Sequence, residues 1–255
     1  MNLIYEYINY LIKSKKRHGI HSPFVYDFTD KCLKIKVDKT TKSNYKKLIK
    51  QLINNTSKIT LEDHGAGSKS SKSSKSSRIS SIYQKASTKG KYAELLYKIS
   101  AHYLPKYTLE LGTNLGIGTY FLSQGNPFGH VTTIEGDPSL FSIAQQNTKH
   151  YCSNSDHHYS TFHHYLAQCN TVFDFIFIDG DHRGTKLLEY LTCLEKNTHD
   201  STIILIDDIR WSEDMFDTWN KIIKMDHYHL SMDLFKFGII LKKHSKEKEH
   251  FIIRY

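Results

Sequence analysis

The sequence predicts an α/β fold in which a mostly parallel sheet carries helices on both faces. From residue 107 onward, short β-rich runs alternate with helical stretches, which is typical of parallel strands joined by crossover helices. Two runs, FDFIFID and TIILID, are almost wholly apolar, as expected for central strands covered on both sides. The last two runs are too close together for a crossover helix, so we expect them to pair antiparallel.

Seven strands are predicted in this region, and together they define a seven-stranded sheet whose last strand is antiparallel. Their predicted ranges are 108–113, 130–135, 158–162, 173–179, 202–207, 229–235 and 237–243.

The N-terminal part is predicted to be a basic helical extension. Apolar residues recur at helical spacing over 2–16, Ser22 followed by Pro23 is a typical helix start, and further helices are expected over 41–54 and 88–103. Lys and Arg outnumber Asp and Glu by 14 in residues 1–105, whereas acidic residues are in excess by 5 in residues 106–255. This change divides the chain into a basic cap (1–105) and a second domain (106–255).

A serine- and lysine-rich segment interrupts the predicted cap. It reads EDHGAGSKSSKSSKSSR and has no large apolar side chain to bury, so we expect a mobile loop at about residues 65–80. Its cations recur every third residue and suit phosphate groups, although a solvated loop without a partner has the same composition.

A glycine-rich loop, LELGTNLGIGT, follows the first predicted strand. Gly112 and Gly116 allow a tight turn and a close approach to a ligand, and the helix after them offers free N–H groups. A dinucleotide-binding loop requires glycine where this sequence has Asn114 and Ile117, so a nicotinamide-dependent oxidoreductase is disfavoured. Glu110 precedes the loop; it would repel a pyrophosphate but suits a cationic ligand.

Acidic residues end the later strands, where ligands bind in parallel sheets. Glu135 ends the second strand and is placed to accept hydrogen bonds from ribose hydroxyls, whereas Asp137, before a proline, is expected to cap a helix. Asp179 ends the fourth strand, and Asp207 and Asp208 end the fifth.

These three aspartates would lie close together if the fourth and fifth strands are neighbours. They could then share a divalent cation; without one, the pKa of at least one carboxyl should rise. Asp181 and His182 crowd the same strand end, in the run FIFIDGDHRG.

The motifs LELGTNLGIGT, TIEGD, FDFIFIDGDH and IILIDDIRW, in this order, resemble the class I methyltransferases that use S-adenosylmethionine (SAM). The likeness is strongest to the small O-methyltransferases of the catechol and caffeoyl-CoA type, and it covers about residues 107–243. The segment RHGIHSPFVYDF is similar to one that precedes this domain in bacterial methyltransferases. The resemblance implies a Rossmann-like sheet with SAM across the first two strand ends. The residues expected to contact SAM are Glu110, Gly112, Thr113, Gly116, Glu135, Gly136 and Asp179.

The resemblance also implies which residues bind a metal ion and which residue acts as the catalytic base. Asp179 and Asp207 match two acids that bind Mg²⁺ or Ca²⁺ in metal-dependent relatives, and Asp208 stands where those enzymes have asparagine. His182 occupies the position of the catalytic lysine of catechol-type enzymes, and histidine is a competent base near neutral pH. We therefore expect His182 and Asp179 to be catalytic and the three aspartates to be candidate metal ligands.

The expected activity is SAM-dependent O-methylation of a small hydroxylated or anionic substrate, with metal assistance left open. The alternative is an RNA methyltransferase, or an RNA-binding protein that no longer methylates, because the cap is strongly basic. Four cysteines without a CxxC pair, no 18-residue apolar run and no signal-peptide pattern favour a cytoplasmic protein. The sequence predicts neither the substrate nor the oligomeric state.

Overall fold

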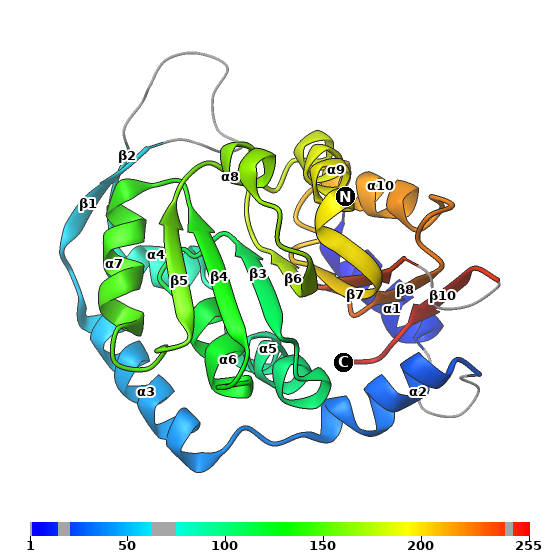
Figure 1. Ribbon diagram of the computed structural model, residues 1–255, viewed down its shortest axis with the longest axis horizontal. Helices are drawn as coiled ribbons and strands as arrows, with labels where there is room; N and C mark the ends of the chain where they lie inside the picture. Colours follow the sequence, from blue (N-terminus) through cyan, green and yellow to red (C-terminus); the bar gives the residue numbers. More distant parts are fainter. Residues whose placement is uncertain (1, 15–20, 63–74, 243–246) are drawn as a thin grey trace. The chain divides into compact units, whose positions relative to one another are not determined.

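The computed structural model describes residues 2–14, 21–62, 75–242 and 247–255 (Figure 1). The chain divides into two compact units: a terminal unit (1–34 and 166–255) and a central unit (35–165). Each unit is described by itself, and the sequence-based division into a cap and a second domain stays a prediction.

The central unit alternates helices with three parallel strands. In chain order its elements are α3 (Lys39–Asn54), β1 (Lys58–Leu61), β2 (Lys75–Arg78), α4 (Ile79–Ala86), α5 (Gly90–Tyr103), β3 (Tyr107–Leu111), α6 (Ile117–Gly125), β4 (His130–Glu135), α7 (Pro138–Thr148) and β5 (Ser155–Tyr159). Helix α8 (Phe162–Gln168) contains the boundary between the units.

The strands of the central unit run in the order β3-β4-β5, and Figure 1 shows them side by side. The register places Glu110 beside Thr133, and Glu135 beside Tyr159. The inward-facing residues of β3 and β4 are buried, and helices α5 and α6 pack against each other. The core of this unit therefore holds the two acid-bearing strands in a fixed register.

The Lys/Ser segment is ordered at its C-terminal end. Lys75–Arg78 form β2, which pairs antiparallel with β1, and α4 begins directly afterwards. Pairing satisfies the backbone hydrogen bonds of a stretch that has no apolar side chain to bury. The predicted loop thus extended too far; the rest of it, residues 63–74, lies outside the described residues.

The terminal unit combines the N-terminal helices with the C-terminal strands. Its elements are α1 (Leu3–Lys13), α2 (Pro23–Asp30), a 3-10 turn (Cys32–Lys34), β6 (Phe173–Ile178), α9 (Gly184–Cys193), a second 3-10 turn (Leu194–Asn197), β7 (Thr198–Ile206), α10 (Glu213–Ile222), β8 (Leu230–Asp233), β9 (Gly238–Leu241) and β10 (Glu249–Ile252).

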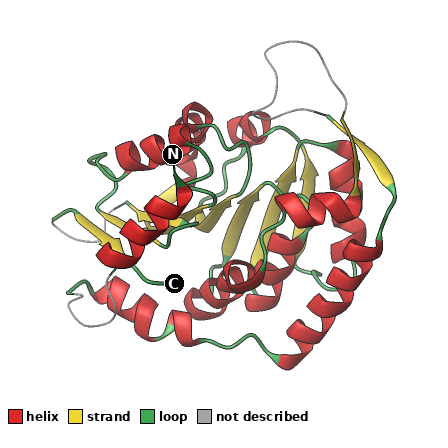
Figure 2. Ribbon diagram, turned by 180° about the vertical axis from the view of Figure 1, so that it is seen from behind, coloured by secondary structure: helices red, strands yellow, loops and turns green. Residues whose placement is uncertain are grey.

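Its strands run in the order β10-β8-β9-β7-β6. Figure 2 shows the strands of the chain in yellow and its helices in red. β9 is antiparallel to β8, as the short connection predicted, and it is also antiparallel to β7, whereas β6 is parallel to β7. β10 pairs parallel with β8 and was not predicted, because its residues EHFI are a short amphipathic run at a sheet edge.

The predicted α/β class is confirmed. The main sheet has eight strands among the described residues, five in the terminal unit and three in the central unit, and it is mostly parallel. The expected seven all occur, with bounds that differ by a few residues, and β10 is the addition. Among the residues with described positions, no helix is long and apolar enough to cross a membrane, and the four cysteines are free.

Helix α1 is anchored to the C-terminus through Tyr10. Its hydroxyl donates to the carbonyl oxygen of Ile253 at 2.5 Å and accepts from the backbone nitrogen of Tyr255 at 2.9 Å. The Tyr10 ring also contacts Phe235, with ring centroids 5.2 Å apart. The N-terminal helix therefore packs on the C-terminal strands of its own unit.

Replacing Tyr10 with phenylalanine should lower the free energy of unfolding by about 1–2 kcal/mol, because a buried carbonyl loses its donor. Tyr5→Phe is the matched control, since Tyr5 is 62% exposed and its change should stay within about 0.5 kcal/mol. Urea denaturation measures both. Equal effects of the two substitutions would contradict this role of Tyr10.

Candidate functional site

The predicted site residues form two groups, one in each unit. The cofactor group lies in the central unit and consists of Glu110, the glycine-rich loop and Glu135; the carboxylate group lies in the terminal unit around Asp207. Each group is described within its unit.

The glycine-rich loop turns sharply at the end of β3. Gly112 has φ +106° and its backbone nitrogen donates to the carbonyl oxygen of Ile134 at 3.0 Å, which ties the loop to β4. Gly116, at φ +82°, begins α6, and a Cβ there would lie 2.7 Å from Cγ2 of Thr148. Gly116 is thus required for backbone conformation and for close packing on α7, whatever the ligand.

Glu110 is buried beneath this loop. One of its carboxylate oxygens, Oε2, accepts hydrogen bonds from the hydroxyls of Thr119 at 2.5 Å and Thr133 at 2.7 Å. Burial raises its pKa to about 7, although the two hydroxyls oppose the rise. Its other oxygen, Oε1, is buried and has no hydrogen-bond partner among the described residues.

Glu135 is held by backbone N–H groups at the end of β4. Its Oε2 accepts from the nitrogen of Asn114 at 2.8 Å, and its Oε1 accepts from the nitrogen of Asp137 at 3.0 Å. Burial raises its pKa, while these bonds and one from the backbone of Gly136 lower it. Glu135 therefore fastens the glycine-rich loop to the strand end and retains lone pairs for further donors.

Two other predictions concern neighbours of Glu135. Asp137 caps α7 as expected, since its carboxylate accepts from the nitrogen of Leu140 at 2.8 Å. Thr113, a predicted SAM contact, shares a hydrogen bond of 2.6 Å with the hydroxyl of Thr133 and is buried. Its side chain braces the loop from within.

The cofactor group has the chemistry that SAM requires. Within the described part of the chain, the buried oxygens Glu110 Oε1 and Asn114 Oδ1 accept no hydrogen bond. Two carboxyl groups with raised pKa lie below and beside the loop, so a ligand with positive charge and hydroxyl donors would satisfy them. The residues present therefore fit SAM.

An aromatic pair lies next to Glu135, in the stretch near Tyr159–His163 where the resemblance implies adenine contacts but the sequence shows no clear match. Tyr159 is 55% exposed, and its ring centroid is 5.8 Å from that of Phe141 on α7. No motif marks Tyr159; only the β4–β5 register places it beside Glu135. An exposed ring at this position offers a surface on which a nucleobase can stack.

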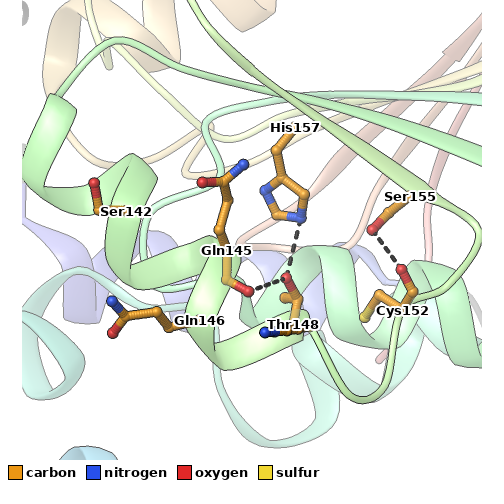
Figure 3. Close-up of a pocket in the computed structure, with 8 residues that line it drawn as sticks. Ser142, Gln145, Gln146, Thr148, Cys152, Ser155 and His157 are labelled. Carbon is orange, nitrogen blue, oxygen red and sulfur yellow. Dashed lines mark hydrogen bonds between the residues drawn. The ribbon is translucent and has the colours of Figure 1, made fainter.

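A polar groove with a volume of about 580 Å³ lies along α7 and β5 (Figure 3). Its lining includes Thr148, whose hydroxyl is 3.0 Å from Nε2 of His157, while burial lowers the pKa of that histidine. None of the predicted site residues lines this groove. Through Thr148 it lies on the α7 side of Gly116, and its lining is polar, with Lys149 as a cationic member.

The carboxylate group of the terminal unit is organised around Asp207. The β6–β7 register pairs Ile178 with Ile206, so Asp179 and Asp207 follow at the same level, as the sequence predicted. Burial and the charges of Asp179 and Asp208 raise the pKa of Asp207 well above its usual range, which confirms the expected rise.

Lys236 carries the compensating positive charge, and it was not predicted. Its Nζ lies 2.6 and 2.7 Å from the two carboxylate oxygens of Asp207 and 3.4 Å from Oδ1 of Asp208. Burial alone would lower its pKa, but the neighbouring carboxylates outweigh burial and raise it. The signal was present in the register: Gly238 pairs with Ile206, which brings the preceding turn to the end of β7.

The predicted metal site does not fit this arrangement. No cluster of His, Cys, Asp or Glu in the described ranges could hold a metal ion, and the Lys236 ammonium group lies against both oxygens of Asp207. A divalent cation would have to displace or repel this ammonium group. The expectation of Mg²⁺ or Ca²⁺ at Asp179, Asp207 and Asp208 is therefore not supported.

His182 lies at the rim of the carboxylate group. Its Nε2 is 3.8 Å from Oδ2 of Asp208, and its ring centroid is 5.8 Å from that of Trp211, which is 63% exposed. The neighbouring Asp181 is occupied differently, since it binds Arg183 through both oxygens at 2.5 and 2.8 Å. Asp181 is thus structural, whereas the side chain of His182 is 26% exposed.

Part of the chain is similar to a known protein family. Residues 109–209 match the family described as a methyltransferase domain. No curated protein matches the chain.

Several solved structures share the fold. The SAH-bound methyltransferase PaMTH1 of Podospora anserina is 12% identical, with a TM-score of 0.60 over 88% of this chain and 97% of that one. A putative caffeoyl-CoA O-methyltransferase of Staphylococcus aureus is 18% identical, with a TM-score of 0.57 over 64% and 88%. The O-methyltransferase TomG of Streptomyces achromogenes, solved with SAM, is 16% identical, with a TM-score of 0.54 over 62% and 82%.

The burial of Glu110 predicts a pH-dependent stability. Between pH 4.5 and about 7 this carboxyl binds more protons in the folded chain than in the unfolded one, so the free energy of unfolding falls as pH rises through this window. At about 1.4 kcal/mol per pKa unit, the contribution amounts to about 3 kcal/mol.

Glu110→Gln should remove this contribution. Between pH 4.5 and pH 8 the free energy of unfolding of the variant should therefore fall by about 3 kcal/mol less than that of the wild type. Chemical denaturation at the two pH values measures the difference. Glu195→Gln, at an exposed position, is the control and should keep the wild-type pH dependence. An unchanged pH dependence in Glu110→Gln would show that Glu110 has an ordinary pKa.

Proposed function

We propose that this chain, which carries a methyltransferase domain over residues 109–209, transfers the methyl group of SAM to a hydroxyl oxygen of a small substrate. The observation that supports this most strongly is the cofactor group: two glutamates with raised pKa below and beside a glycine-rich loop, with buried acceptor oxygens that lack donors in the described structure. Oxygen as the acceptor is what the resemblance to the small O-methyltransferases implies, and the structures that share the fold include O-methyltransferases.

In this proposal each residue of the cofactor group has a separate task. Glu135 accepts hydrogen bonds from the two ribose hydroxyls through lone pairs that its backbone donors leave open. Glu110 acts from beneath the loop, where its charge stabilises a cationic ligand. Tyr159 and Phe141 offer the stacking surface for the adenine, and Gly112 lets the backbone turn closely around the methionine part.

Bound SAM supplies an electrophilic methyl group on a positively charged sulfur. The remaining task of the protein is to orient the acceptor hydroxyl and to take its proton, and positioning contributes most of the rate in such reactions. We assign the proton transfer to His182, with Asp208 at ion-pair distance to stabilise the protonated ring. Asp179 supports this end of the site through its contact with Asp207.

No structural observation favours the RNA alternative. It rests on the basic charge of residues 1–105, part of which lies outside the described residues, and it stays a prediction.

The direct test of the cofactor group is the binding of S-adenosylhomocysteine (SAH), measured by titration calorimetry. Glu135→Gln should weaken SAH binding by about tenfold to a hundredfold, because a carboxyl with two acceptor oxygens becomes an amide with one. Asp156→Asn is the control, since Asp156 lies on β5 with its side chain 66% exposed and pairs only at the surface with His130. Unmeasurable binding of both SAH and SAM by the wild type would refute the proposed function.

The pKa of Glu110 adds a second prediction, on the pH dependence of binding. SAM carries a sulfonium charge that SAH lacks, so SAM should bind more tightly as Glu110 ionises when pH rises through about 7. The ratio of SAM to SAH affinity should rise by up to about tenfold for each pKa unit by which SAM lowers the Glu110 pKa. Glu110→Gln should flatten this ratio, and a wild-type ratio constant from pH 5.5 to 8.5 would contradict the role of Glu110.

A further inference from the structure

The turn between β8 and β9 fixes Lys236 against the carboxylate group. Phe235, directly before it, has φ +71°, and the carbonyl oxygen of Lys236 accepts from the nitrogen of Ile209 at 3.1 Å. A bulky residue adopts such a backbone conformation only when its surroundings impose it. The chain therefore accepts backbone strain in order to hold Lys236 at this point.

A buried ion pair supplies much of that constraint. Arg210 binds both oxygens of Asp233 at 2.6 and 2.8 Å and also donates to the carbonyl oxygen of Phe235 at 2.8 Å. Asp233 in turn accepts from the nitrogen of Phe235 at 2.8 Å. The ring of Tyr7 on α1 packs edge-on against the ring of Phe235, with ring centroids 4.9 Å apart. Arg210, Asp233 and Tyr7 thus all contact Phe235 and hold the turn in place.

The acceptor capacity of Asp207 is taken up by protein donors. Its Oδ1 accepts hydrogen bonds from Lys236 Nζ and from the backbone nitrogen of Asp208, the latter at 2.5 Å. Its Oδ2 accepts a second hydrogen bond from Lys236 Nζ. The side chain of Asp179 contacts the same carboxyl group. A carboxylate offers about four lone-pair sites, so little remains for a metal ion. The ammonium group also stands where the attraction of the aspartates for a cation is greatest.

We propose that Lys236 is the built-in cation of the carboxylate group, taking the place that a divalent metal would hold among Asp179, Asp207 and Asp208. In catalysis, which rests on the proposed function, its ammonium group stabilises the negative charge that develops on the acceptor oxygen. The Lys236 side chain is 29% exposed, and Asp208 beside it is 22% exposed, so the cation is reachable from solution. His182 then takes the proton at the same rim, and Trp211 offers an aromatic surface for the acceptor.

The test measures the binding of Mn²⁺, as a probe for divalent metals, by electron paramagnetic resonance. Wild-type protein should not bind Mn²⁺ at millimolar concentration. Lys236→Met, which is one atom shorter and removes the charge, should bind Mn²⁺ at least tenfold more tightly than the wild type. Lys236→Arg is the matched control; it keeps the charge and should not bind. The double variant Lys236→Met/Asp207→Asn should lose the binding gained.

Each outcome is decisive. Binding of Mn²⁺ by the wild type that Asp207→Asn abolishes would overturn the proposal, and this result does not depend on whether the lysine variants fold. A folded Lys236→Met that binds no better than the wild type would also overturn it, because the aspartates would then not form a cation site. SAH titration of the same samples tests the cofactor group independently of Mn²⁺. If the wild type does not bind SAH, the proposed function is refuted, while the Mn²⁺ result still tests the role of Lys236.

Discussion

A carboxylate buried at the end of a strand must be paired, protonated or bound by a ligand, and this constraint governs both groups of site residues. The two units satisfy this requirement in different ways. In the terminal unit the protein supplies the counter-charge itself, through Lys236 against Asp207. In the central unit the described residues give Glu110 two neutral hydroxyl donors and no cation, and burial raises its pKa to about 7. We assign the group without a counter-charge, around Glu110, to the cofactor, because a cationic ligand would supply the missing positive charge.

The fold explains how a few residues come to serve these tasks. Parallel strands deliver their C-terminal residues to one edge, and the registers of β3 with β4 and of β6 with β7 bring acids from different strands to the same level. The antiparallel β8–β9 hairpin adds a residue that no parallel strand end could provide. Its turn reaches the end of β7 because Gly238 pairs with Ile206, and a Cβ at Gly238 would lie 2.5 Å from the buried ring of Trp219.

Much of this could be predicted from the sequence, for identifiable reasons. Apolar runs that stop abruptly in acids marked β3, β4, β6 and β7 and their terminal residues, and the short gap before the last strand predicted its antiparallel pairing. Lys236 and Tyr159 could not be found in this way, because each depends on the register between strands rather than on a local motif. The expected metal site lacks support for a related reason: the sequence analysis counted three aspartates without the lysine that the hairpin brings to them. Strand β10 was missed because a four-residue edge strand has little apolar periodicity.

The central claim is that Glu110 is an under-compensated carboxyl whose charge is meant for a cationic cofactor. The most direct measurement is an NMR titration of the Glu110 side-chain carbon, with and without SAM. The account predicts a pKa of about 7 in the free protein and a clear decrease when SAM is present. An ordinary pKa near 4.5 in the free protein, or a raised pKa that SAM leaves unchanged, would contradict it.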